Sequence, residues 1–135
     1  MQRPKPTAGL HHVALYVSNF TDCEYFYTQL LGMTVDWRPD ADNLYLTSGN
    51  DNLALHRAPA DFVPAKQQRL DHIGFFLTER AAVDTWHEFL QTQGIKIKAA
   101  PKDHRDGTCS FYCADPDGNT VQMIYMPKYS TNHLK

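Results

Sequence analysis

Two histidines, His12 and His72, occupy equivalent places in two similar stretches of the sequence. Residues 10–16 read LHHVALY and residues 70–76 read LDHIGFF, so a leucine, a polar residue, a histidine and an aliphatic residue follow in the same order. Neutral imidazole is the commonest metal ligand in proteins, and it is also a general acid or base near neutral pH. The repeat is therefore either one strand used twice for packing or one site assembled from two halves.

The alternation of side chains within each stretch predicts where the two histidines lie. Successive side chains of a strand point to opposite faces, so the apolar residues of each stretch are expected to pack against a helix. These residues are Val13, Leu15 and Val17 in the first stretch and Ile73, Phe75 and Leu77 in the second. The opposite face then carries His12 beside Ala14, and His72 beside Gly74. Small residues next to both histidines leave room for a ligand.

The elements that must position the histidines are repeated as well. Apolar residues at three- and four-residue spacing predict helices within residues 18–33 and 78–94, which Gly32 and Gly94 are suited to end. Strand-like segments follow each helix, at residues 33–38, 43–49 and 53–57, and at residues 95–100, 108–113 and 120–125. The sequence DPDGN, which precedes the last of these segments, is a strong turn signal.

This pattern predicts two βαβββ modules within a single domain that spans residues 1–135. The first module covers about residues 9–58 and the second about residues 70–126. Residues 59–69, which contain Pro59 and Pro64, are expected to link the modules, and residues 127–135 to form a C-terminal tail.

The composition favours a small-molecule partner. The formal net charge is −2 and the basic residues are scattered, which argues against a nucleic-acid binder. No apolar run approaches the roughly 20 residues that a membrane-spanning helix needs. The chain has three cysteines, and its first nine residues lack the apolar core of a signal peptide, so we expect a reducing, cytoplasmic location.

Several motifs together resemble the vicinal oxygen chelate superfamily. They are the duplicated βαβββ pattern, the L-x-H-[IV] strand starts, the FY-x-x-x-LG end of the first helix (residues 26–32) and the DPDGN turn at residues 115–119. The superfamily includes glyoxalases, epimerases, extradiol dioxygenases, fosfomycin resistance enzymes and bleomycin-binding proteins. The resemblance extends from about Gly9 to Met126, and it implies an α+β fold. In that fold, two tandem modules form a cupped, barrel-like mixed sheet with the helices outside, often in a homodimer.

The resemblance also implies a divalent metal ion, Fe, Mn, Ni or Zn, whose substrate chelates it through adjacent oxygen atoms. His12 and His72 match the two ligands on the first strands of the modules. The last strand of the second module normally reads GN-x-x-E, and here Gln122 replaces the glutamate. An amide oxygen can coordinate a metal, but two imidazoles and an amide do not compensate its charge as a 2-His-1-carboxylate set does.

A fourth ligand would come from residues 53–57. By comparison with Gln122, the ligand position there falls on Ala54, which has no ligating atom. His56 lies one pleat further along the strand, and a shift of one residue by a β-bulge would bring it to the metal. His56 is therefore a candidate for metal binding or for acid–base catalysis.

A finer resemblance concerns the extradiol dioxygenases, which carry a tyrosine in an S-F-Y strand ten residues before the ligand glutamate. Tyr112 stands in that motif, ten residues before Gln122, and His104 precedes it in a loop. The histidine pair that opens the corresponding strand of those enzymes, one of which is the acid–base catalyst, is absent before residues 53–57. Tyr112 and His56 are thus the candidate catalytic residues.

Two classes of function remain open. In the first, His12, His72 and Gln122, with or without His56, hold a metal in a dioxygenase, lyase or isomerase. In the second, the chain is a metal-free protein of the bleomycin-resistance type that binds a drug or an aromatic compound. Gln122 would then be a cavity-lining amide bonded to Tyr112 or to water. Retention of both first-strand histidines favours the enzyme.

Overall fold

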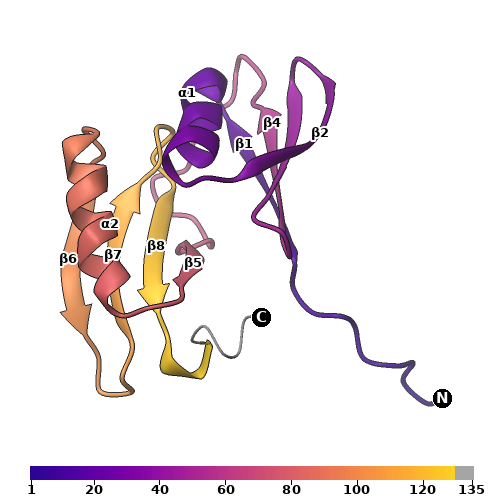
Figure 1. Ribbon diagram of the computed structural model, residues 1–135. Helices are drawn as coiled ribbons and strands as arrows, with labels where there is room; N and C mark the ends of the chain where they lie inside the picture. The colour runs from indigo at the N-terminus through magenta and orange to yellow at the C-terminus, as the bar shows by residue number, and fades with distance from the viewer. Residues whose placement is uncertain (130–135) are drawn as a thin grey trace. The chain divides into compact units, whose positions relative to one another are not determined.

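The computed structural model describes residues 1–129 and divides into two compact units, of which the first spans Met1–Ala60 and the second begins at Asp61. In each unit a helix packs on a four-stranded sheet (Figure 1). Beyond Tyr129, the predicted tail lies outside the described residues. That the two modules make up a single domain stays a prediction.

In the first unit, the first and last strands of the module lie side by side. The elements are β1 (His12–Val17), α1 (Phe20–Tyr25), the π-helical turn η1 (Phe26–Leu30), β2 (Thr34–Asp40), β3 (Asn43–Thr47) and β4 (Asn52–Arg57). The sheet has the order β1-β4-β3-β2, in which β1 pairs with β4 in parallel and the other pairs are antiparallel.

The second unit repeats this topology. Its elements are β5 (Ile73–Leu77), α2 (Ala81–Thr92), β6 (Ile97–Asp103), β7 (Cys109–Ala114), β8 (Thr120–Tyr125) and the short 3-10 helix η2 (Pro127–Tyr129). The strand order is β5-β8-β7-β6, again with one parallel pair, β5 and β8. The predicted α+β class and the two βαβββ modules are therefore confirmed, as two mixed sheets that are not closed into a barrel.

Both predicted helices end at glycine. In the first unit, the helix continues past Tyr25 as a π-helical turn, in which the Leu31 N–H donates to the Phe26 carbonyl oxygen at 3.0 Å. Gly32 follows with a φ of +84° and Gly94 ends α2 with a φ of +77°, a conformation that other residues adopt only at a cost. The chain can therefore leave each helix sharply and enter the next strand.

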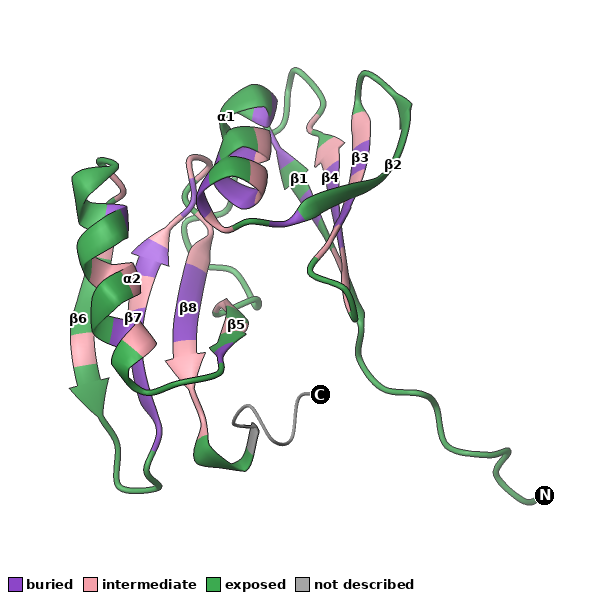
Figure 2. Ribbon diagram, in the orientation of Figure 1, coloured by how far each residue is buried: buried purple, intermediate pink, exposed green. Residues whose placement is uncertain are grey.

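The predicted alternation of side chains holds in the first strands (Figure 2). Leu15 and Val17 are buried, whereas the other face of β1 is exposed, including His12 and Tyr16. The cores are built from residues that are fully buried, among them Val17, Phe26, Tyr27, Leu44, Leu46, Leu55, Val83, Leu90, Phe111 and Val121. Each helix thus covers one face of its sheet, and the histidines stand on the other.

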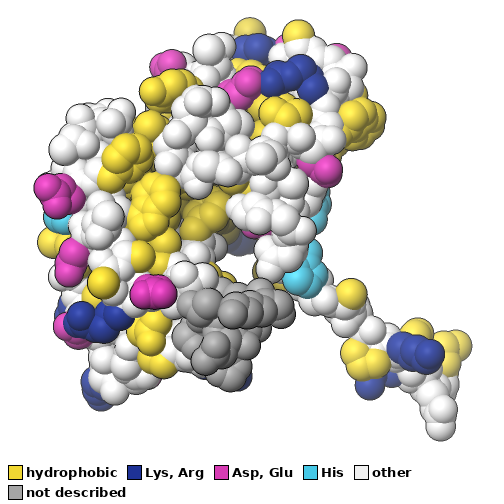
Figure 3. Space-filling model, in the orientation of Figure 1, with side chains coloured by type: hydrophobic (Ala, Val, Ile, Leu, Met, Phe, Trp, Pro, Cys, Tyr) yellow, Lys and Arg dark blue, Asp and Glu magenta, His cyan; other side chains and the backbone are white. Residues whose placement is uncertain are grey.

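Large apolar side chains remain exposed in both units (Figure 3). Tyr16, Val35 and Trp37 in the first unit and Phe76 in the second are each about half exposed. Within residues 1–129, no helix combines the length and the apolar character that crossing a membrane requires.

The DPDGN turn between β7 and β8 depends on the buried carboxylate of Asp115. This carboxylate accepts hydrogen bonds from the backbone N–H groups of Asp117 and Asn119 and from the Asn119 side-chain amide, each at 2.9 Å. Asp115→Ala leaves these donors without their partner, so we expect the free energy of unfolding to fall by about 1–3 kcal/mol. Urea denaturation followed by tryptophan fluorescence measures the change. Asp61→Ala, at an exposed carboxylate in the linker, is the matched control, and equal midpoints for the two variants would contradict this role.

Candidate functional site

His12 is held at the edge of the first sheet by a side-chain amide. The register of β1 and β4 places Asn52 opposite His12, and the Asn52 Oδ1 atom lies 2.7 Å from His12 Nδ1. The Asn52 amide in turn donates to the Asp36 carboxylate at 3.5 Å. Because Oδ1 can only accept, His12 Nδ1 carries the proton and Nε2 keeps its lone pair. In this tautomer Nε2 can bind a metal ion.

His56 lies on the same face of the sheet as His12 but further along it. The register of β1 and β4 runs without a shift, so Ala54 pairs with Ala14 and His56 pairs with Tyr16. The β-bulge that would bring His56 to the ligand position is absent from this strand pair. His12 and His56 are four residues apart along the strands, or about 13 Å. The structure therefore does not bring these two histidines together within the unit.

His56 has an amide partner of its own. Asn43 Oδ1 lies 2.6 Å from His56 Nδ1, and the Asn43 amide donates to the Asp40 carboxylate at 2.9 and 3.1 Å. The backbone N–H of Asp42 and the Asn43 side chain hold the pKa of Asp40 below its usual range. The arrangement repeats the His–Asn–Asp series at His12, and it leaves His56 Nε2 as the free ring nitrogen.

In the second unit, His72 is oriented by a carboxylate. Its Nδ1 atom lies 2.6 Å from Asp71 Oδ2, so Nε2 is again the nitrogen left for a ligand. The His72 ring also stands edge-on to Tyr112, with the ring centroids 5.2 Å apart. The structure thus places His72 beside one of the two predicted catalytic residues.

Gln122 completes this group from β8. Its side chain is nearly buried, and its Nε2 group donates to Ser110 Oγ at 3.1 Å and to the Tyr112 hydroxyl at 3.0 Å. Gly74 is the partner of Gln122 across the strand pair, and a Cβ atom at Gly74 would lie 3.6 Å from Gln122 Oε1. The oxygen therefore faces the side of Gly74, and the small residue there keeps it open. His72, Tyr112 and Gln122 therefore lie in one group, and their roles as ligands or catalyst stay predictions.

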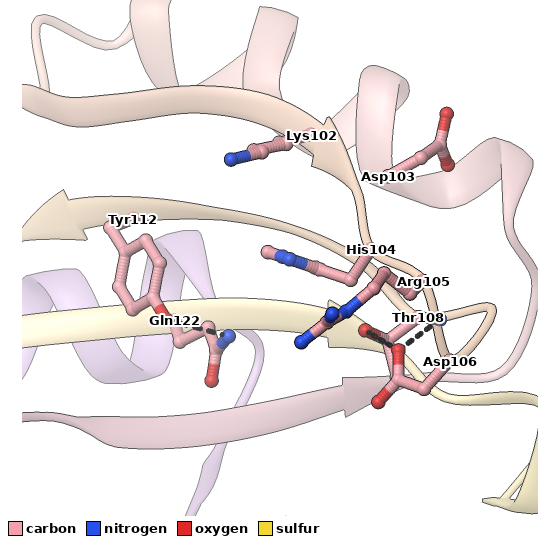
Figure 4. Close-up of a pocket in the computed structure, with 8 residues that line it drawn as sticks. All are labelled: Lys102, Asp103, His104, Arg105, Asp106, Thr108, Tyr112 and Gln122. Atoms are coloured by element: carbon pink, nitrogen blue, oxygen red, sulfur yellow. Dashed lines mark hydrogen bonds between the residues drawn. The ribbon is translucent and has the colours of Figure 1, made fainter.

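A pocket of about 580 Å³ opens next to Gln122 and Tyr112 (Figure 4). The rest of its lining comes from the end of β6 and the loop to β7: Lys102, Asp103, His104, Arg105, Asp106 and Thr108. The side chains of Lys102, His104 and Arg105 point into the space between the strands, whereas the Asp103 carboxylate points away. His104 Nε2 lies 3.3 Å from Ser110 Oγ.

Lys102 and Arg105 are pocket residues that the sequence did not reveal. A lysine or an arginine in a polar loop is usually solvated, and only their closeness to each other within residues 102–106 could have marked them. His104, which the sequence did single out, lines the pocket as well.

His11 and Cys113 are poor metal ligands. His11 places both ring nitrogens on backbone oxygens, at Asn50 and Ala8. Cys113 is buried, and burial together with nearby Asp115 raises the pKa of its thiol to about 12. Within residues 1–129, no group of three or more His, Cys, Asp or Glu side chains is arranged to hold a metal ion.

Comparisons with known proteins agree with this fold. Residues 9–123 match the Glyoxalase/Bleomycin resistance protein/Dioxygenase superfamily. Glutathione transferase FosA of Serratia marcescens is 29% identical over 118 residues, which are 85% of this chain and 79% of that protein. An uncharacterized protein of Pseudomonas aeruginosa is 30% identical over 124 residues, with coverage of 86% and 87%.

Solved structures show the same architecture. Lactoylglutathione lyase from Agrobacterium tumefaciens has a TM-score of 0.72 at 22% identity, covering 90% of this chain and 96% of that one. An integron cassette protein from the mobile metagenome of Halifax Harbour sewage outfall has a TM-score of 0.73 at 24% identity, with coverage of 89% and 100%. On these matches, the chain belongs to the Glyoxalase/Bleomycin resistance protein/Dioxygenase superfamily.

Proposed function

We propose that this protein is a divalent-metal-dependent enzyme that acts on a small substrate through adjacent oxygen atoms. The observation that carries the proposal is shared by His12 and His72: each places Nδ1 against a side-chain oxygen, at 2.7 and 2.6 Å, and keeps Nε2 for another partner. Histidines that ligate metals nearly always donate the other ring N–H to such an oxygen, which fixes the tautomer and the ring.

The atom types of the three proposed donors suit a divalent metal ion. We assign His12 Nε2, His72 Nε2 and Gln122 Oε1 as ligands, because no described residue donates a hydrogen bond to that amide oxygen. His12 belongs to the first unit, whereas His72 and Gln122 belong to the second. The two units that contribute to one site come from one chain or from two copies in a homodimer. When bound, a divalent metal polarises the oxygen atoms of its substrate as a Lewis acid.

The charge of this donor set favours Lewis-acid chemistry over oxidation. A 2-His-1-carboxylate set is typical of iron oxygenases, and here the carboxylate is an amide. Asp71 supplies a negative charge next to the proposed ligands, because its carboxylate lies 2.6 Å from His72 Nδ1. A transferase, lyase or isomerase reaction needs no change of oxidation state at the metal, and we propose that class for this protein.

The candidate catalytic residues, Tyr112 and His56, each carry a group that can transfer a proton. Tyr112 faces the pocket beside His72 and Gln122, where its hydroxyl can hold or deliver a proton. The Asn43 amide oxygen accepts the Nδ1 proton of His56, so His56 Nε2 keeps the lone pair that a general base needs. The register of β4 places His56 about 13 Å from His12, so His56 is less suited than Tyr112 to act at the proposed metal.

The named relatives support an enzyme. Glutathione transferase FosA, at 29% identity, and lactoylglutathione lyase, which shares the fold, are enzymes by their names. Both names refer to a glutathione-linked reaction, so thiol conjugates of small molecules are the first substrates to assay.

A second function, metal-free binding of an aromatic compound, is favoured by a different observation. Both N–H groups of Gln122 are engaged by Ser110 and Tyr112, as expected for an amide that lines a cavity. Tyr16, Trp37 and Phe76 also expose large aromatic surfaces on which a planar compound could stack. Metal affinity separates the two functions, since this alternative needs none.

The tautomers of the histidines can be measured directly. In long-range 1H–15N NMR spectra of neutral imidazoles, we expect His12, His56 and His72 to carry the proton on Nδ1. Asn52→Ala removes the acceptor of His12, so its signals should move toward the Nε2–H tautomer while those of His56 stay unchanged. An Nε2–H tautomer for His12 or His72 in the unmodified protein would contradict the assignment of Nε2 as the ligand.

Metal affinity tests the role of Asp71. We expect Asp71→Ala to weaken Zn(II) or Co(II) binding about 10- to 100-fold, as loss of a partner of a metal-ligating histidine does. His72→Ala should remove binding altogether, and Asp61→Ala should leave it unchanged. Competition with a chromophoric chelator gives the dissociation constants. If Asp71→Ala and Asp61→Ala bind the metal equally well, Asp71 does not support a metal ligand.

A further inference from the structure

The rings of four residues lie close together on the face of the first sheet that α1 leaves uncovered. Tyr16 pairs with His56 across β1 and β4, and Trp37 pairs with Tyr45 across β2 and β3. The His56 ring stands edge-on to Tyr16 and Tyr45, with centroids 6.4 and 5.9 Å away, and Trp37 stacks on Tyr45 at 5.2 Å. Tyr16 and Trp37 are 59% and 58% exposed. A ligand can therefore contact these four rings, which we call the His56 cluster.

One nitrogen atom of the His56 cluster is free to accept a hydrogen bond. The Asn43 amide nitrogen donates to the Asp40 carboxylate, so its oxygen is the atom that lies 2.6 Å from His56 Nδ1. Because that oxygen can only accept, Nδ1 carries the proton of the neutral imidazole and Nε2 keeps a lone pair. No residue within positions 1–129 donates a hydrogen bond to His56 Nε2. A ligand group that meets this nitrogen must therefore be a donor.

The carboxylates next to the cluster keep their negative charge. Asp40 accepts from the Asn43 amide, and Asp36 accepts from the Asn52 amide, so both carboxylates have neutral partners. Neither of them forms an ion pair within residues 1–129. The hydrogen bonds from Asp42 and Asn43 also hold the pKa of Asp40 below its usual range. This side of the sheet is consequently negative near neutral pH.

The cations of the first unit's sheet lie toward the helix. Between the start of β1 and the end of β4 the sequence has no lysine and only two arginines. Arg38 pairs with Glu24 of α1 at 2.6 Å, and the Arg57 guanidinium lies 4.7 Å above the Phe20 ring of the same helix. The charge of Asp40 and Asp36 is therefore not offset by a basic side chain on their own face.

We propose that the His56 cluster binds an ammonium group of a small ligand. An ammonium N–H donates to His56 Nε2, and the exposed rings of Tyr16 and Trp37 attract the cation through their π-electrons. Asp40 adds the attraction of an uncompensated negative charge. An anion would be repelled by the same carboxylate, and a neutral planar ring would leave the lone pair of His56 unused.

The inference goes beyond the proposed metal site, because it concerns the first unit alone and applies to protein without metal. It also gives His56 a role that suits its position about 13 Å from His12 along the strands. A substrate that chelates the metal at one end and carries an ammonium at the other would span this distance. His56 would then be a specificity-determining residue.

The first test uses butylammonium as the probe, with butan-1-ol and butyrate as its neutral and anionic counterparts. Chelator-treated protein is titrated at constant ionic strength and at about pH 8, where an ordinary imidazole is neutral and an alkylammonium is charged. We expect butylammonium to shift the His56 ring signals and the Trp37 indole signal in 1H–15N NMR spectra in a saturable way. Butan-1-ol and butyrate should leave these signals in place.

Variants then separate the three contributions to binding. His56→Phe keeps a ring but removes the acceptor, and should weaken butylammonium binding about tenfold, the effect of one hydrogen bond to a charged group. Asp40→Asn and Trp37→Leu should each weaken it about threefold, as loss of an exposed charge or of a cation–π contact does. Asp61→Asn in the linker and Tyr25→Leu on α1 are the exposed matched controls, and should bind as the unmodified protein does.

Three results would overturn the inference. They are the absence of saturable shifts with butylammonium, equal binding of butylammonium and butan-1-ol, and unchanged affinity in both His56→Phe and Asp40→Asn. Because metal is removed throughout, failure of the metal-binding proposal leaves the test valid. Conversely, a protein that binds metal but not butylammonium would keep the metal site and lose the ammonium site.

Discussion

The parallel pairing of the first and last strands in each unit decides which side chains can meet. In the second unit it sets Gly74 against Gln122, so the amide oxygen faces a residue without a side chain. In the first unit the same pairing sets His12 against Asn52, which orients the imidazole, and sets His56 against Tyr16. The helix of each unit covers the opposite face, so His12 is exposed and His56 is partly exposed. A change of one residue in either register would turn them toward the helix.

The chemistry then follows from where charge is placed. The proposed ligands are neutral, and carboxylates interact with them only through hydrogen bonds. Asp71 bonds to His72 directly, whereas Asp36 is linked to His12 through Asn52. Carboxylates in such positions orient and strengthen imidazole ligands without occupying the metal. A site with Gln122 in place of the glutamate can therefore still bind a metal ion, with one negative charge fewer among its ligands.

The fold and half of the candidate site could be predicted from the sequence because they depend on local patterns. Helical spacing, the two glycine stops and the repeated strands were sufficient for the two modules, and alternation placed His12 and His72 on the open faces. Asn52, Asn43 and Asp36 were missed, since their roles arise from pairing between strands distant in sequence. His56 was ambiguous for the same reason: only the register, which runs without a bulge, separates it from the ligand position. Lys102 and Arg105 were missed as well, since only the folded second unit brings them into one pocket with Tyr112 and Gln122.

The central claim is that His12, His72 and Gln122 bind one divalent metal, and anomalous diffraction tests it most directly. Crystals of the protein grown with Co(II) or Zn(II) should show an anomalous peak about 2.0–2.2 Å from Nε2 of both histidines and from the Gln122 amide oxygen. The same map would show whether the two histidines come from one chain or from two. A peak on Nδ1, a peak at another site, or no peak beside His72 at full metal concentration would contradict the account.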